Sequence, residues 1–160
     1  MKATKQPRWP EKFPGWEQTE VRDHYDPSDE ALNTRFLPSP LPLAKARERR
    51  LDGEPLEYLL GHCHVGEITL KCDFRALIPR QETETLLRRF TRRLDRLPEG
   101  PLVDCGTGTG LIAGWLSKRT NRYVLATERY AKPMELAREN RGLNGWHFPL
   151  VRTDRLSGIG

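Results

Sequence analysis

One nonapeptide constrains the fold of this chain more than any other segment. Residues 102–110 read LVDCGTGTG, an apolar run that ends in Asp104 and opens into three alternate glycines, Gly106, Gly108 and Gly110. Glycine lets the backbone take a positive φ and lets a ligand approach the main chain without a Cβ in the way. A helix expected over residues 111–118 would direct free N–H groups and its positive dipole end at this loop. The pattern therefore predicts a strand, a turn and a helix that form a site for a small cofactor.

Two classes of ligand fit such a loop. A dinucleotide site requires G-x-G-x-x-G/A, which Gly108, Gly110 and Ala113 satisfy, so a nicotinamide dinucleotide stays an alternative. A pyrophosphate gains nothing from a nearby carboxylate, whereas the sulfonium and ammonium groups of S-adenosylmethionine are cations that Asp104 would favour. The pattern D-x-G-x-G-x-G, which includes Thr107, therefore favours S-adenosylmethionine. A tight turn without any ligand is the third interpretation.

Two more strands with acidic ends follow the loop. The apolar run 122–127 ends at Glu128, where a carboxylate could accept hydrogen bonds from both ribose hydroxyls of a cofactor. A helix over 133–140 and a third strand over 147–152 come next, and Asp154 then stands where an acid could accept from an adenine amino group. This alternation predicts an α/β fold, one half of a doubly wound sheet.

The segment before the loop carries a family resemblance. Its first motif is formed by Gly53, Pro55, Tyr58 and Gly61, and its second by Leu77, Ile78, Pro79, Arg80, Glu82, Thr83 and Glu84. These motifs resemble the G-x-P-x-x-Y-x-x-G and L-I-P-R-P-E-T-E segments of the HemK/PrmC-type glutamine methyltransferases of peptide-chain release factors. The resemblance covers roughly residues 45–155, and it is specific because several motifs agree in order and spacing.

The resemblance implies a Rossmann-like methyltransferase sheet preceded by a linker with a β-hairpin. It implies S-adenosylmethionine as cofactor, with Asp104 and the glycine loop at its amino-acid end, Glu128 at the ribose and Asp154 at the adenine. Arg80 and Thr83 would brace the donor and the substrate loop. The implied reaction is methyl transfer to a glutamine amide nitrogen of a release factor, the partner protein.

The chain departs from the family in three places, one of which is Val65 in place of a usual aromatic residue of the hairpin. Gln81 stands where the family has proline, which makes the turn into the helix less rigid. The Asn-Pro-Pro-Tyr motif that clamps the substrate amide occurs nowhere in the 160 residues, so no catalytic residue is assigned. We therefore expect a truncated and inactive methyltransferase. A non-catalytic binding protein and an NAD-dependent oxidoreductase are the alternatives.

Three segments are expected along the chain. Residues 1–52 would be an N-terminal segment of low order followed by a helix over 43–52, with a short helix possible over 29–35. Residues 53–80 would form the hairpin linker, and residues 81–160 the partial S-adenosylmethionine-binding domain. Hydrophobic residues make up 36% of the chain, below the ordinary share for a compact α/β domain, which agrees with an incomplete enzyme.

The net charge of +5 comes largely from arginine. A helix expected over residues 81–97 would bury one apolar face, composed of Leu86, Phe90, Leu94 and Leu97. Its other face carries Arg88, Arg89, Arg92, Arg93 and Arg96. We interpret these arginines as a solvated face with partial pairing, such as Glu84 with Arg88, and expect no direct nucleic-acid binding.

Metal and membrane sites are not expected. His62, Cys63, His64 and Cys72 are all possible ligands, but neighbouring strand residues point to opposite faces and no C-x-x-C spacing occurs. The sequence shows no signal peptide or transmembrane stretch. The segment 70–72 resembles the eukaryotic, organellar branch of the family, which implies a mitochondrial location, with the cytoplasm as alternative.

Overall fold

The computed structural model describes residue 41 and residues 43–158. The chain divides into two compact units, of which the first ends at Gly61 and the second begins at His62. The expectations for residues 1–40, including the short helix over 29–35, lie outside the described residues. The first unit contains α3 (Leu43–Leu51) and α4 (Leu56–Leu60). The helix predicted over 43–52 is thus confirmed as α3.

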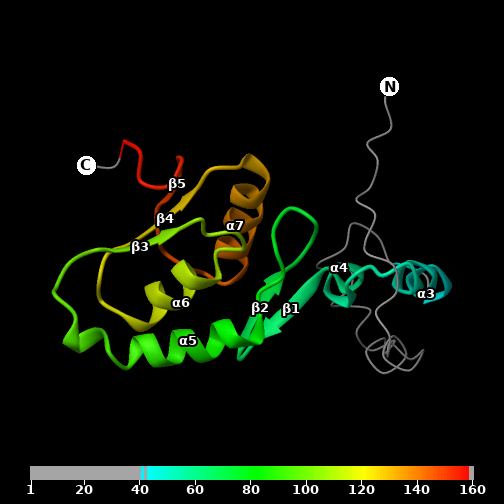
Figure 1. Cartoon of the computed structure of the whole chain (residues 1–160), viewed down its shortest axis with the longest axis horizontal. Coiled ribbons are helices and arrows are strands. Elements are labelled where there is room, and N and C mark those ends of the chain that lie inside the picture. The colour runs from blue at the N-terminus through cyan, green and yellow to red at the C-terminus, as the bar shows by residue number, and fades with distance from the viewer. Residues whose placement is uncertain (1–40, 42, 159–160) are drawn as a thin grey trace. The chain divides into compact units, whose positions relative to one another are not determined.

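The second unit begins with the predicted hairpin (Figure 1). Strands β1 (His62–Val65) and β2 (Ile68–Lys71) pair antiparallel, with Val65 opposite Ile68. A tight turn joins them at Gly66, whose φ of +58° lies in the left-handed region that favours glycine. Because side chains alternate along a strand, Cys63 and Val65 of β1 are buried while His64 between them is exposed.

Within the described residues this unit has a second sheet of three parallel strands: β3 (Leu102–Cys105), β4 (Val124–Glu128) and β5 (Leu150–Arg152). They lie side by side in the order β3-β4-β5, as Figure 1 shows. The central strand β4 is buried at every position, while β3 exposes Val103 at the edge of the described sheet. This arrangement confirms the predicted α/β fold, because parallel strands joined by helical crossovers build a doubly wound sheet.

Two helices complete the crossovers: α6 (Leu111–Arg119) and α7 (Ala131–Leu143). Helix α6 contacts β3 and β4, and α7 contacts β4, β5 and the hairpin strand β2. Pro133 lies in the first turn of α7, where a missing N–H costs no helical hydrogen bond. The helix continues past the predicted end at Asn140 to Leu143, and it includes Gly142, which was expected to break it. Strand β5 begins only after Pro149, whose carbonyl accepts from the Ala126 N–H at 2.9 Å.

The helix predicted over residues 81–97 is wrong in its length and in part of its buried face, since Leu94 is buried as expected and Phe90 is half-buried. Helix α5 covers Gln81–Thr91, and a separate 3-10 turn, η2, covers Leu94–Arg96. The helical period identified Leu86 and Leu97 as core, yet they are 63% and 41% exposed, whereas Leu87 is 3% exposed. The contact of α5 with α6 decides which leucine faces inward, and the break after α5 ends the register before Leu97.

The arginine face of this segment is as expected. Arg88, Arg89, Arg92, Arg93 and Arg96 are all exposed. The predicted pair of Glu84 with Arg88 is present, with a carboxylate oxygen of Glu84 2.7 Å from Nη2 of Arg88. Arg88 also lies over the ring of Trp115, 5.6 Å from its centroid. These contacts support the interpretation of a solvated, partly paired helix face.

Candidate functional site

The candidate site lies where the three parallel strands end. Asp104 is the third residue of β3, Glu128 is the last residue of β4, and Asp154 follows β5 by two residues. Because parallel strands end at the same edge of a sheet, the chain brings all three acids to this edge. In open α/β sheets ligands bind outside this edge. The loop 106–110 between β3 and α6 lies there too.

The glycine loop has its own hydrogen-bonded shape. The N–H groups of Gly106 and Thr107 both donate to the carbonyl of Thr127 on β4, at 2.9 Å each. Gly106 and Gly108 have φ values of +81° and +55°, and a Cβ added at either would meet no atom within 4 Å. The left-handed backbone therefore requires glycine, and open space lies beside both residues. Such a cradle has room for a ligand against the main chain.

Asp104 connects the strand, the loop and the helix. It is 7% exposed, and its Oδ2 accepts hydrogen bonds from Thr107 Oγ1 at 2.6 Å and from the Ala113 N–H at 3.0 Å. Burial raises the pKa of this carboxyl and the charge of Glu128 adds to the rise, while the two hydrogen bonds oppose it. Within the described residues Oδ1 makes no hydrogen bond. A buried carboxylate with one free oxygen is suited to a cationic group.

Glu128 holds the other side of the loop. It is 7% exposed, its Oε2 accepts from the Gly108 N–H at 3.2 Å, and its Oε1 accepts from the Tyr130 N–H at 3.0 Å. Both bonds are to backbone donors, and each carboxylate oxygen keeps a second lone pair for a ligand hydroxyl. The structure therefore places Glu128 in contact with the loop that the sequence assigned to the same cofactor.

Asp154 is more open than the other two acids. Its side chain is 51% exposed, and Oδ2 lies 3.4 Å from Nη1 of Arg129, the residue after Glu128. The Thr153 N–H donates to the Glu128 carbonyl at 3.0 Å, which joins the ends of β4 and β5. Asp154 thus follows the end of β5, beside the end of β4, and its side chain is open to solvent.

Arg80 and Thr83 lie at the start of α5. Arg80 is its N-cap residue, and its carbonyl accepts from the Thr83 N–H at 3.0 Å. Arg80 is exposed and Thr83 is half-buried. Within the described part of the chain neither side chain makes a hydrogen bond to the loop 106–110. Their assignment to the donor site stays a prediction.

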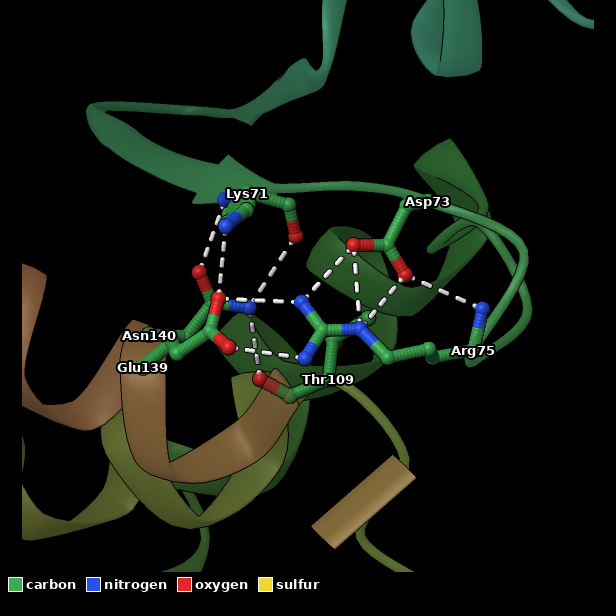
Figure 2. A network of polar contacts seen from close by, with 6 residues as sticks. All are labelled: Lys71, Asp73, Arg75, Thr109, Glu139 and Asn140. Atoms are coloured by element: carbon green, nitrogen blue, oxygen red, sulfur yellow. Dashed lines mark hydrogen bonds and ion pairs between the residues drawn. The ribbon is translucent and has the colours of Figure 1, made fainter. Parts of the chain in front are cut away.

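A polar network behind the loop was missed by sequence reasoning. Asn140 of α7 is fully buried and bonds both to Lys71 at the end of β2 and to the Thr109 carbonyl of the loop (Figure 2). Its neighbour Glu139 pairs with Lys71 and with Arg75. The sequence contains no signal for this network, because its partners are 31 to 69 residues apart.

Other features lie away from the site. A groove of about 810 Å³ is lined by residues 121–124 and 146–149 together with Arg141, at the opposite, amino-terminal end of β4 and β5.

Of the possible metal ligands, Cys63 and Cys72 are buried with their sulfurs 3.0 Å apart, while Nδ1 of His64 lies 3.1 Å from Thr69 Oγ1. Within residues 43–158 no three histidine, cysteine, aspartate or glutamate side chains lie together in a way that could hold a metal ion. Among the helices described, none has the length and apolarity needed to cross a membrane.

Curated relatives resemble a large part of the chain. A release factor glutamine methyltransferase of Deinococcus radiodurans is 38% identical over 113 residues, which are 70% of this chain and 41% of that protein. The enzymes of the same description from Xylella fastidiosa and Vibrio cholerae are 33% and 42% identical, over 73% and 58% of this chain and 46% and 32% of theirs. The chain thus spans less than half the length of these curated relatives.

A solved structure supports the fold. A structure described as a transferase, from Pyrococcus horikoshii, matches with a TM-score of 0.52 at 18% identity. The match covers 62% of this chain and 38% of the Pyrococcus chain. No model of a protein family matches the chain. The resemblance expected from the motifs at residues 53–84 is confirmed by the curated relatives. Over the part that aligns with them, the chain is a homologue of the release factor glutamine methyltransferases.

Proposed function

We propose that this chain binds S-adenosylmethionine at the glycine loop and is the donor-binding part of a release factor glutamine methyltransferase. The observation that carries the proposal is Asp104, a buried carboxylate with Oδ1 unbonded, beside a loop that is open at Gly106 and Gly108. The residues fit the donor because its amino-acid end carries an ammonium group that a buried acid attracts. The homology to methyltransferases supports the same ligand.

Each residue of the site has a proposed part in binding. Asp104 would accept from the donor's ammonium group, Glu128 would accept from the ribose hydroxyls, and Asp154 from the adenine amino group. The bound donor would supply an electrophilic methyl group on a sulfonium. The chain's own contribution is to fix the donor's orientation, because methyl transfer depends mainly on placing the reacting atoms in line.

The geometry favours this ligand over a dinucleotide. In a dinucleotide site the pyrophosphate lies on the N–H groups at the start of the helix after the glycines. Here the Ala113 N–H in the first turn of α6 already donates to the Asp104 carboxylate. A diphosphate at this position would meet a buried negative charge. The proposal therefore excludes NAD as the ligand of the loop.

The substrate side is proposed from the homology alone. The relatives are described as release factor glutamine methyltransferases, and we propose the same substrate for this protein. Asn-Pro-Pro-Tyr does not occur in the 160 residues. We therefore expect donor binding by this chain without methyl transfer when it is assayed alone. Measurable turnover on a release factor would contradict that expectation.

Isothermal titration calorimetry with S-adenosylmethionine, S-adenosylhomocysteine and NAD tests the proposal. Asp104→Asn should weaken donor binding by tenfold or more, about 1.4 kcal/mol, because it removes the charge facing the ammonium group. The asparagine can still accept from Ala113 N–H, so the fold should persist. Asp95→Asn is the control, because it makes the same change of net charge at an exposed position on η2. Binding of NAD with no binding of either donor compound would overturn the proposal.

The pH dependence of binding gives a second readout. Burial raises the pKa of Asp104 above its ordinary 3.8, so the carboxyl takes up a proton at a higher pH than an exposed aspartate does. Only the ionised form attracts the ammonium group. Donor affinity should therefore fall as the pH is lowered into the acidic range, and the Asp104→Asn variant should lack this decrease. An identical pH profile in both proteins would contradict the role of Asp104.

A further inference from the structure

One buried amide connects three separate parts of the second unit. Asn140 of α7 has no exposed surface, and its Oδ1 accepts from the Lys71 N–H at 2.7 Å. Its Nδ2 donates to the Lys71 carbonyl at 3.1 Å and to the Thr109 carbonyl at 3.0 Å (Figure 2). One side chain therefore joins a helix, the end of the hairpin and the glycine loop. Both protons and the oxygen of the amide are used, so the group is fully satisfied.

The hydrogen bond to the Thr109 carbonyl lies in a stretch of backbone flanked by two glycines. Thr109 lies between Gly108 and Gly110, and both glycines have φ in the left-handed region, at +55° and +83°. Glycine loses more conformational freedom on ordering than any other residue. A hydrogen bond that fixes the peptide between two glycines removes much of this freedom before a ligand arrives. Preorganisation of this kind raises affinity by lowering the cost of ordering on binding.

The loop is held from two sides by different kinds of group. On the side of the sheet the Gly108 N–H donates to Glu128, an acid assigned to the ligand itself. On the side of α7 the carbonyl of the next residue, Thr109, accepts from Asn140. A ligand hydroxyl that binds Glu128 lies on the same side of the loop as the first bond and has no access to the fully buried second one. Asn140 can therefore keep the loop in shape while the ligand side rearranges.

Ion pairs hold the hairpin exit to the same helix. Glu139 Oε2 lies 2.7 Å from Lys71 Nζ, and Glu139 Oε1 lies 2.7 Å from Arg75 Nη1. The Arg75 guanidinium also pairs with Asp73 at 2.7 Å (Figure 2). These contacts fix the segment after β2 against α7. Two consecutive residues of one helix, Glu139 and Asn140, thus contact the hairpin exit, and Asn140 also contacts the glycine loop.

We propose that Asn140 is a positioning residue for the donor site, which couples the β1–β2 hairpin to the glycine loop through the Thr109 carbonyl. The inference rests on the proposed donor binding for its effect on affinity. Its effect on the loop itself is independent of any ligand. Asn140 touches no ligand and does no chemistry. It acts through Thr109 on the loop that lies between Asp104 and α6.

A matched control residue lies one helical turn further on. Asn144 Nδ2 donates to the Thr69 carbonyl of the same hairpin at 2.9 Å and to the Asn140 carbonyl at 3.1 Å. No described contact joins its side chain to the glycine loop. Asn144→Ala should therefore loosen the hairpin against α7 without releasing Thr109. Asn140→Ala should release both.

Hydrogen–deuterium exchange of the ligand-free protein tests the structural half of the proposal. In Asn140→Ala the amides of residues 106–110 should exchange at least tenfold faster, while β4 keeps its protection. In Asn144→Ala the acceleration should be confined to the hairpin. Equal loop exchange in the wild type and Asn140→Ala, or equal acceleration in both variants, would overturn the inference.

Titration with S-adenosylhomocysteine tests the functional half. Asn140→Ala should bind about tenfold more weakly than the wild type, and Asn144→Ala within twofold of it. If the wild type binds neither donor compound, the proposed function fails while the exchange experiment still decides the role of Asn140. If the wild type binds a donor compound and the two variants bind it with equal affinity, only the positioning role of Asn140 fails.

A measurement on the wild type covers the case in which Asn140→Ala does not fold. The side-chain amide protons of Asn140, distinguished from those of the other three asparagines by replacing Asn33, Asn121 and Asn144 one at a time with alanine, should exchange slowly in NMR spectra of the asparagine-labelled protein. They should shift when S-adenosylhomocysteine is added, because the loop that they bind then changes its environment. Fast exchange of these protons, or a bound state in which they do not shift, would count against the proposal.

Discussion

Replacement of Gly114 by alanine should lower the free energy of unfolding of the second unit, although alanine is the better helix former. Gly114 lies within α6, and a Cβ built on it would stand 2.2 Å from two carbons of the Trp146 ring and 2.5 Å from a third. Carbon atoms in contact prefer separations of about 3.5–4.0 Å. Trp146 is 4% exposed, so its ring has little room to move away.

The magnitude follows from two opposing effects. Alanine is favoured over glycine in a helix interior by about 0.8–1 kcal/mol. Overpacking of a well-packed core costs about 1–3 kcal/mol, and three ring atoms inside contact distance place this site at the upper end. The net loss should be about 1–2 kcal/mol. For a unit of this size that loss lowers Tm by roughly 4–16 °C.

Thermal and urea unfolding, followed by circular dichroism, measure the effect, and Gly142→Ala provides the control. Gly142 lies near the end of α7, and a Cβ there would meet no atom within 4 Å. That variant should gain about 0.5 kcal/mol from helix propensity alone. If Gly114→Ala were stabilised to the same degree, the packing of Trp146 on α6 would be refuted. Trp146→Phe combined with Gly114→Ala should cost less than the sum of the single changes, because the two residues are in contact.

Two further outcomes are expected from the polar and sulfur groups. Hydrogen bonding to Arg75 is the main cause that lowers the pKa of Glu139 from 4.5 to about 2, so the unfolded chain takes up this proton first as the pH falls. Stability should therefore be lost between pH 4.5 and 2, and Glu139→Gln should show a smaller loss of urea midpoint across that window; an equal loss would contradict the ion pairs. Cys105 is exposed, while Cys63 and Cys72 are buried, so a maleimide should label one thiol quickly and two only slowly in the native protein. Rapid labelling of two thiols would show that the hairpin packing differs.

The local parts of the fold and of the site could be predicted from the sequence. The strand, glycine turn and helix around residues 102–119 depend on neighbours in the chain, because positive φ, apolar runs and helix starts are local properties. Asp104 and Glu128 were identified because each ends or nearly ends such a strand. The hairpin followed from the motifs before and after it. For these elements the chain order also fixed which acids reach the same edge of the sheet.

The rest depended on contacts between distant residues. The helical period assigned Leu86 to the core, whereas the packing of α5 on α6 buries Leu87 instead. Asn140 looked like the last residue of a helix, yet its partners lie 31 and 69 residues earlier in the chain.

The sequence by itself determined the class of the fold, the glycine loop and the acids beside it, because those features follow from residue type and short-range order. Only the tertiary structure decided which oxygen of Asp104 is already used and how the loop is held from behind. The physical reason is that a buried hydrogen bond depends on the positions of both partners. Those positions exist only once the strands and helices have packed together.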